Sequence, residues 1–139
     1  MSNEIKKGLL GIVVDETTIS HVVPELSTLT YRGYTVQELC DKCDFEEVAY
    51  LVLYGELPNK SQLKKFIKQE RSERKLSKQI INDIKKMPKN AHPMDVIRTC
   101  VSLMALEDKD TRDNSPKANM RKTMRIFAKT PTAVAAYFR

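Results

Sequence analysis

Residues that carry metal, redox or acid–base chemistry are scarce in this chain: three cysteines and two histidines among 139 residues. Cys40 and Cys43 have the spacing of a metal or redox pair, but a four-coordinate metal needs two further ligands. Only His21 and His92 are available for that role, and no second cysteine pair exists. The sequence therefore favours structural roles for the cysteines and predicts no metal site.

Long apolar runs are also missing, which excludes a membrane-spanning segment. The first residues are charged, and their apolar stretch breaks at Asp15 and Glu16, unlike a secretory signal peptide. An odd, low cysteine count without a secretion signal indicates free thiols. We therefore predict a cytoplasmic protein with no membrane partner.

Positive charge is concentrated in one stretch of the chain. Eleven Lys or Arg and three acidic residues lie between Lys60 and Lys89, an excess of eight positive charges, whereas the rest carries a net charge of −2. A basic surface of this kind attracts nucleic acid or phosphorylated ligands. Phe66 is the only aromatic residue among these charges, so the pattern favours a solvated helix pair and no nucleic-acid partner.

The first 34 residues have the pattern of extended structure. Residues 18–22 and 28–31 alternate polar and apolar side chains, and a Pro-containing turn separates them, which predicts a small β-hairpin that Gly33 ends.

From residue 35 onward the sequence is punctuated by helix-capping residues. Thr35 with Glu38 forms a capping box, and the following helix should end near Lys42. Later helices are expected to start at Asp44, Asn59, Ser77, His92 and Ser115. The apolar stretch from Val48 to Tyr54 should be buried on most sides, and Thr130-Pro131 should kink or restart the last helix. The prediction is a mainly α fold: a small β-hairpin followed by about six helices.

Eight short blocks together resemble the citrate synthase family, which includes the 2-methylcitrate synthases. These blocks are Gly8–Val13, Glu16–Ser20, Leu29–Tyr34, Phe45–Leu51, Tyr54–Pro58, Ala91–Thr99, Ser115–Asn119 and Lys129–Thr132. The likeness covers essentially the whole chain, and the ordered set is highly specific although each block alone is common.

The resemblance implies that residues 1–139 are an N-terminal segment of the family's large domain, with 1–34 extended and 35–139 helical. Family chains are much longer, and this one ends inside an apolar run without a helix stop signal. The family condenses oxaloacetate with acetyl-CoA or propionyl-CoA and hydrolyses the thioester, with no cofactor besides these substrates. Its two catalytic histidines and its aspartate come from a part that is absent here, so we expect no catalytic residue and no activity in this segment.

Few residues of this segment are expected to contact substrate. By the resemblance, Lys60 lies where some 2-methylcitrate synthases have a substrate contact. Asn59-Lys60 stands where Thr-Arg is commoner in those relatives, and lysine cannot reproduce a bidentate arginine contact. His92 is expected to cap a helix rather than catalyse, and His21 to lie on the sheet surface. Arg32 is expected to reach an acidic side chain of the fold; a separate anion site is the weaker reading.

The resemblance also implies a homodimer through the helices that start at His92 and Thr132. The expected interface residues are Met94, Ile97, Val101, Met104, Val134 and Tyr137. Together with Phe138 they offer more apolar surface than six short helices should cover. The alternative reading is an ordinary core helix, and a broad apolar surface can serve both roles.

A second hypothesis comes from the basic stretch. The chain would then be a self-standing helical interaction module whose Lys60–Lys89 region binds an acidic partner.

Overall fold

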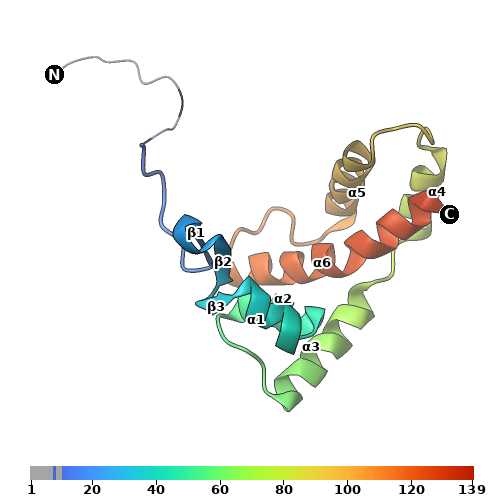
Figure 1. The fold of residues 1–139 in the computed structure, drawn as a ribbon. Helices are drawn as coiled ribbons and strands as arrows, with labels where there is room; N and C mark the ends of the chain where they lie inside the picture. The colour runs from blue at the N-terminus through green and yellow to red at the C-terminus, as the bar shows by residue number, and fades with distance from the viewer. Residues whose placement is uncertain (1–7, 9–10) are drawn as a thin grey trace. The chain divides into compact units, whose positions relative to one another are not determined.

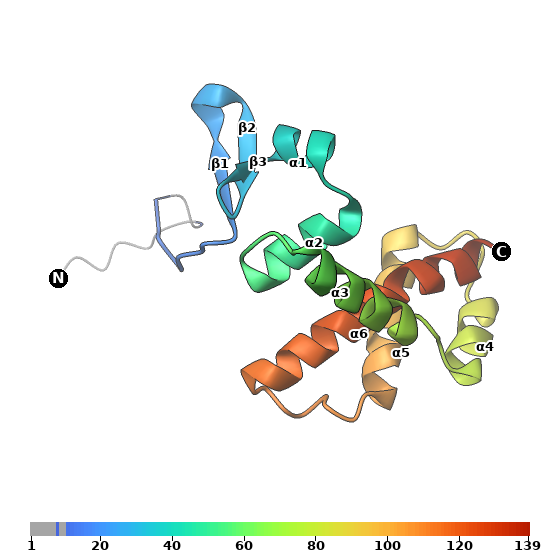
Figure 2. The same ribbon diagram turned by 90° about the horizontal axis from the view of Figure 1, so that it is seen from below.

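The computed structural model describes residues 8 and 11–139, with the side chain of Leu26 left out. Part of the Gly8–Val13 block and the start of the predicted extended region fall outside the described residues. The chain divides into two compact units, residues 1–63 and 64–139, and each is described by itself. Figure 1 and Figure 2 show the elements of each unit from two directions.

A small antiparallel sheet begins the first unit. Its strands are β1 (Ser20–Val23), β2 (Thr28–Tyr31) and β3 (Tyr34–Thr35), in the order β1-β2-β3. A short 3-10 turn, Pro24–Leu26, joins β1 to β2. The predicted hairpin is confirmed, with its first strand two residues later than expected.

The third strand was not predicted, and a tight turn explains it. Arg32 and Gly33 both have positive φ, at 50° and 89°. Two consecutive left-handed residues form the kind of turn that matches the twist of a hairpin. Gly33 therefore does not simply end β2; the turn brings Tyr34 back beside Tyr31.

Two capped helices complete the first unit, α1 (Val36–Lys42) and α2 (Phe45–Tyr54). The predicted capping box is present, because the Glu38 amide donates to Thr35 Oγ1 at 3.2 Å and the Thr35 amide to Glu38 Oε2 at 3.3 Å. Gly55 ends α2 in the left-handed conformation, with φ of 92°. The prediction that α2 is buried on most sides is wrong. Only Leu51 of this helix is fully buried, because its other apolar residues are half-buried or exposed.

Helix α3 (Lys60–Glu73) carries five of the eleven basic residues of the Lys60–Lys89 stretch. Asn59 caps it: the Gln62 amide donates to Asn59 Oδ1 at 3.0 Å, and the Asn59 amide donates back to Gln62 Oε1 at 2.8 Å. Phe66 and Glu70 are buried, whereas Lys64 and the other lysines of this helix are exposed. This arrangement agrees with the predicted solvated helix face.

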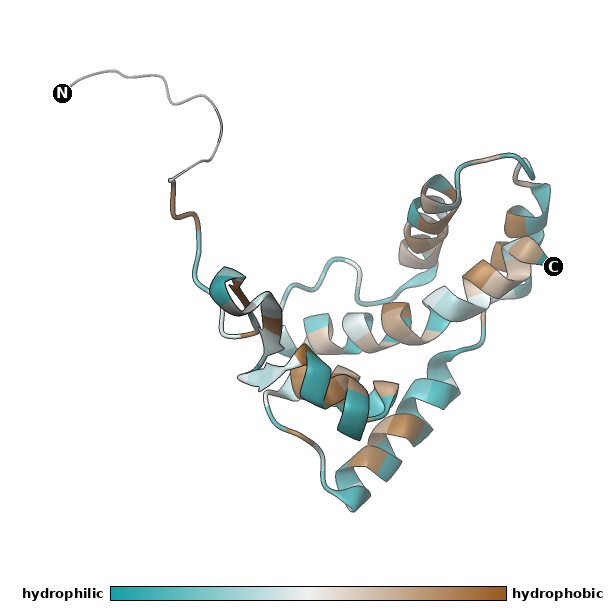
Figure 3. Ribbon diagram, viewed as in Figure 1, coloured by the Kyte–Doolittle hydropathy of each residue, from teal (hydrophilic) through white to brown (hydrophobic). Residues whose placement is uncertain are grey.

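The second unit packs three further helices together: α4 (Lys78–Lys86), α5 (Pro93–Glu107) and α6 (Pro116–Phe138). Ser77, His92 and Ser115 cap them through their side chains, as predicted. One core joins all three helices, and Figure 3 shows apolar residues along α4, α5 and α6. Its buried members are Leu76, Ile80, Ile84, Val96, Cys100, Met104, Ala133 and Tyr137.

Helix α6 is continuous through Pro131, so the prediction that a separate helix restarts at Thr132 is wrong. Proline removes one backbone donor from the helix. Ala128 before it and Ala133 after it are both buried, so burial favours a single helix across the proline. The predicted Thr132 helix is the C-terminal part of α6. None of the described helices is long and apolar enough to cross a membrane.

The core cluster makes a first prediction. Ile84 is 0% exposed, whereas Leu106, also on a helix of this unit, is 83% exposed. We expect Ile84→Ala to lower the free energy of unfolding by about 2–5 kcal/mol, because it removes buried carbon and leaves a cavity. Leu106→Ala is the matched control and should change it by less than about 0.5 kcal/mol. Urea denaturation followed by circular dichroism measures both, and equal losses would contradict this core assignment.

Candidate functional site: an apolar groove between α5 and α6

An apolar groove runs between α5 and α6 in the second unit. Its free space is only about 10 Å³, roughly that of one water molecule. Thr130 is the only residue in its lining with a side-chain hydroxyl besides Tyr137, and the other residues are apolar. The groove is therefore closely packed by the unit's own side chains and has an apolar lining. Its lining residues are Pro93, Val96, Ile97, Cys100, Val101, Met104, Thr130, Ala133, Val134, Tyr137 and Phe138.

The predicted interface residues mostly converge on this groove. Five of the six line it, and Met94 lies outside the lining but is 62% exposed. Met104 and Tyr137 are buried in the unit's own core, so the expectation that they offer uncovered surface is wrong. Their burial follows from the packing of α5 against α6, which the helical period alone does not reveal. Phe138, 68% exposed, remains the largest apolar side chain at the rim.

Tyr137 is held by polar contacts at its edge. Its hydroxyl donates to the Pro88 carbonyl at 2.7 Å, and Lys89 Nζ donates to the Tyr137 carbonyl at 2.9 Å. The Lys89 ammonium also lies 5.2 Å from the centre of the Tyr137 ring. These contacts tie the last turns of α6 to the connection between α4 and α5. Sequence reasoning missed them because 48 and 49 residues separate the partners.

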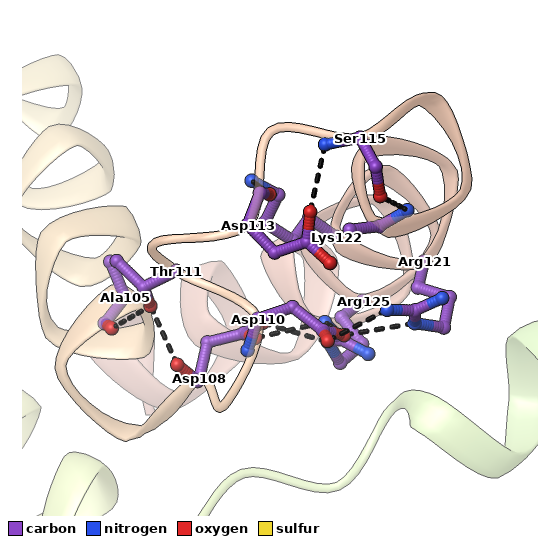
Figure 4. A network of polar contacts seen from close by, with 10 residues as sticks. Ala105, Asp108, Asp110, Thr111, Asp113, Ser115, Arg121, Lys122 and Arg125 are labelled. Atoms are coloured by element: carbon purple, nitrogen blue, oxygen red, sulfur yellow. Dashed lines mark hydrogen bonds and ion pairs between the residues drawn. The ribbon is translucent and has the colours of Figure 1, made fainter.

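A charged network joins the loop after α5 to α6 (Figure 4). Arg125 donates to Asp108 at 2.7 and 2.8 Å and to Asp110 at 2.6 Å. Arg121 donates to Asp110 through two nitrogens, at 3.0 and 2.8 Å. Bidentate contacts of this kind fix both distance and orientation. The network therefore fixes the loop at the C-terminal end of α5 against the N-terminal half of α6. These two helices form the walls of the groove.

The arginines lower the pKa values of both carboxyl groups. Hydrogen bonds from Arg121 and then Arg125 hold the pKa of Asp110 well below its usual value of 3.8. Burial acts to raise the pKa of Asp108, but the hydrogen bond from Arg125 and other contacts outweigh it, so that pKa is also lowered. The one signal in the sequence was the spacing of Arg121 and Arg125, four residues apart on one helix face.

The two histidines have structural positions. His92 Nδ1 accepts a hydrogen bond from the Met94 amide at 3.2 Å, which confirms the predicted helix cap. His21 is exposed on β1, opposite Thr30, which confirms its place on the sheet surface. No group of three or more His, Cys, Asp or Glu side chains that could hold a metal occurs among the described residues.

Arg32 forms hydrogen bonds from the turn between β2 and β3. Arg32 was expected to reach an acid, but it donates to the Thr18 hydroxyl at 2.7 Å and to the Val52 carbonyl at 3.0 Å. These neutral acceptors tie the β2–β3 turn to α2. Among the contacts of the described residues, Arg32 has no acidic partner, so that expectation is wrong.

Lys60 is exposed at the first position of α3, and its role in substrate binding stays a prediction.

Known structures show the class of fold. The citrate synthase of Thermotoga maritima superposes with a TM-score of 0.83 at 32% identity, covering 98% of this chain and 35% of that chain. The citrate synthase of Pyrobaculum aerophilum superposes with a TM-score of 0.84 at 30% identity, covering 94% of this chain and 35% of that one. The predicted fold class, a mainly α part of the citrate synthase fold with a small sheet, is confirmed.

Sequence comparison then identifies the family. Residues 8–139 match the family model described as "Citrate synthase, C-terminal domain". The 2-methylcitrate synthase of Mycobacterium tuberculosis is 48% identical over 132 residues, which cover 95% of this chain and 33% of that protein. The citrate synthase of Mycolicibacterium smegmatis is also 48% identical, over 97% of this chain and 36% of that protein. This chain belongs to the citrate synthase family, and it spans about a third of the length of these relatives.

The charged network leads to a prediction about stability and pH. Asp110→Asn should lower the urea midpoint at pH 7, because Arg121 and Arg125 lose a charged acceptor. The folded-state pKa of Asp110 lies below the ordinary value, so its stabilisation is complete above about pH 4 and declines as the pH falls toward the folded pKa. The difference between the wild type and Asp110→Asn should therefore shrink steadily below pH 4.

Asp95→Asn is the matched control. Asp95 forms an exposed pair with Arg98 at 3.0 Å on α5, and exposed pairs contribute little. Its loss should change the urea midpoint at pH 7 much less than the loss of Asp110. A constant difference for Asp110→Asn from pH 7 to pH 3 would show that its charge is not the stabilising feature.

Proposed function

We propose that this chain is the N-terminal part of a citrate or 2-methylcitrate synthase, an enzyme that condenses oxaloacetate with acetyl-CoA or propionyl-CoA and hydrolyses the thioester. The observation that carries the proposal is 48% identity to relatives of both names over nearly the whole chain. Because the two names occur at the same identity, the proposal covers both acyl groups.

The groups that the reaction requires can be compared with the residues of this segment. Forming the carbon–carbon bond requires a base that removes a weakly acidic proton and donors that hold the enolate oxygen. Of the two histidines, His92 is occupied as a helix cap and His21 is exposed on a strand. We therefore place the catalytic residues of the whole enzyme outside residues 1–139, with this segment as part of its scaffold.

The quickest test is to read the gene beyond codon 139. A reading frame that continues with further histidines and an aspartate supports the proposal. A stop codon at that point favours either the interaction module based on the Lys60–Lys89 region or a degenerate gene.

An activity assay gives the biochemical prediction. The purified 139-residue chain should release no thiol above background from acetyl-CoA or propionyl-CoA in the presence of oxaloacetate. A full-length citrate synthase serves as the positive control in the same assay. Turnover that survives purification and disappears in His92→Ala would contradict the structural role of that histidine.

The groove between α5 and α6 supports a second part of the proposal, a homodimer formed through these helices. Its rim exposes Phe138, while Ile97, Val101 and Val134 are half-buried in its lining. Each large apolar side chain that a second copy covers contributes roughly 1.5–3 kcal/mol when fully buried.

Self-association can be measured directly. Sedimentation equilibrium over a concentration series should show a dimer, and Phe138→Glu should shift it toward monomer because it places a charge at the rim. Leu106→Glu is the matched control, since Leu106 lies on α5 outside the groove lining and is also largely exposed. A well-folded monomer at every concentration, or equal effects of the two variants, would contradict this interface.

A further inference from the structure

A pocket in the second unit gathers positive charge that the proposed synthase function does not use. It lies where the end of α6 meets α4, and Figure 1 and Figure 2 both show these two segments beside each other. Its free space is about 650 Å³, within the range of about 300–1,000 Å³ that small-molecule sites occupy. None of its lining residues lines the groove between α5 and α6, so the two features are separate.

Three of the lining residues are basic: Lys85, Lys89 and Arg139. No Asp or Glu among the described residues lines the pocket. Lys85 and Arg139 are exposed, and their side chains form no hydrogen bond or ion pair with other described residues. Three like charges around one cavity repel each other, so an anion that enters the cavity lowers the electrostatic free energy.

Lys89 is the basic residue that the fold holds in position. Its ammonium donates to the Tyr137 carbonyl at 2.9 Å and lies 5.2 Å from the centre of the Tyr137 ring. An ammonium has three N–H donors, so two remain for an anion. Arg139 adds a planar guanidinium, which can bind phosphate through two nitrogens. These donors suit an anion that has several oxygen acceptors and more than one negative charge.

The rest of the lining sets the size and character of the ligand. Ile81, Ala135 and Ala136 form an apolar wall, and Thr132 supplies a hydroxyl. An inorganic phosphate ion would leave most of the pocket empty and the apolar wall in water. A phosphate ester with a carbon ring would use the charges and also cover the wall, which adds hydrophobic stabilisation.

We propose that this pocket binds a small organic phosphate. The phosphate lies among the three basic side chains, and the carbon body packs against Ile81 and the two alanines. Because the lining comes from both α4 and α6, the bound ligand holds these helices together and stabilises the folded state of the second unit.

The test is isothermal titration calorimetry of the 139-residue chain at pH 7 and low ionic strength, with naphthyl phosphate as the probe. One naphthyl phosphate should bind per chain. Inorganic phosphate and uncharged naphthol, which each carry only half of the recognised chemistry, should bind at least about 10-fold more weakly.

Two variants locate the binding. Lys85→Gln and Arg139→Gln should each weaken the affinity for naphthyl phosphate by about 10-fold, because each removes a charge-assisted hydrogen bond. Lys85→Arg keeps the charge and should retain binding. Lys89 is left intact, because its contact with Tyr137 supports the fold. Circular dichroism checks that each variant remains folded.

Lys86→Gln is the matched control. Lys86 is the next residue of α4 and is exposed outside the lining, with its ammonium 4.0 Å from a carboxylate oxygen of Asp83. Its loss should leave the affinity unchanged. Equal losses in Lys85→Gln and Lys86→Gln would indicate diffuse attraction to a basic surface and overturn the proposal. It would also be overturned if naphthyl phosphate does not bind, or if either inorganic phosphate or naphthol binds equally well.

Discussion

The second unit depends on one long helix that buries the same face along its length. Helix α6 contacts both α4 and α5, and its buried residues lie on either side of Pro131. A proline inside a helix removes a hydrogen bond and normally bends or breaks it. Here burial of Ala128, Ala133 and Tyr137 holds both halves in one element. Without that continuous face, neither the common core nor the groove beside it would form.

Charge and packing act on opposite ends of the same helix pair. Near the start of α6, Arg121 and Arg125 bind the two aspartates of the preceding loop. Near its end, Tyr137 packs in the core and bonds to Pro88. The groove therefore lies between two anchored ends, which hold its two walls in place.

The two units offer different chemistry. The second has a tight apolar groove between α5 and α6, whereas the first has a pocket of about 250 Å³ that Cys40 and Cys43 help to line. Both units lie within the stretch of the chain that matches the citrate synthase family.

The features that the sequence determined by itself are those that depend on local interactions. The β-hairpin and the helix caps formed by Thr35, Asn59, Ser77, His92 and Ser115 follow from contacts within a few residues, because capping groups and turns satisfy nearby backbone atoms. Tertiary structure alone decided that Met104 and Tyr137 are buried, that α6 passes through Pro131, and that Arg125 binds Asp108. Those outcomes depend on contacts between residues far apart in the chain, for which short-range periodicity carries no information.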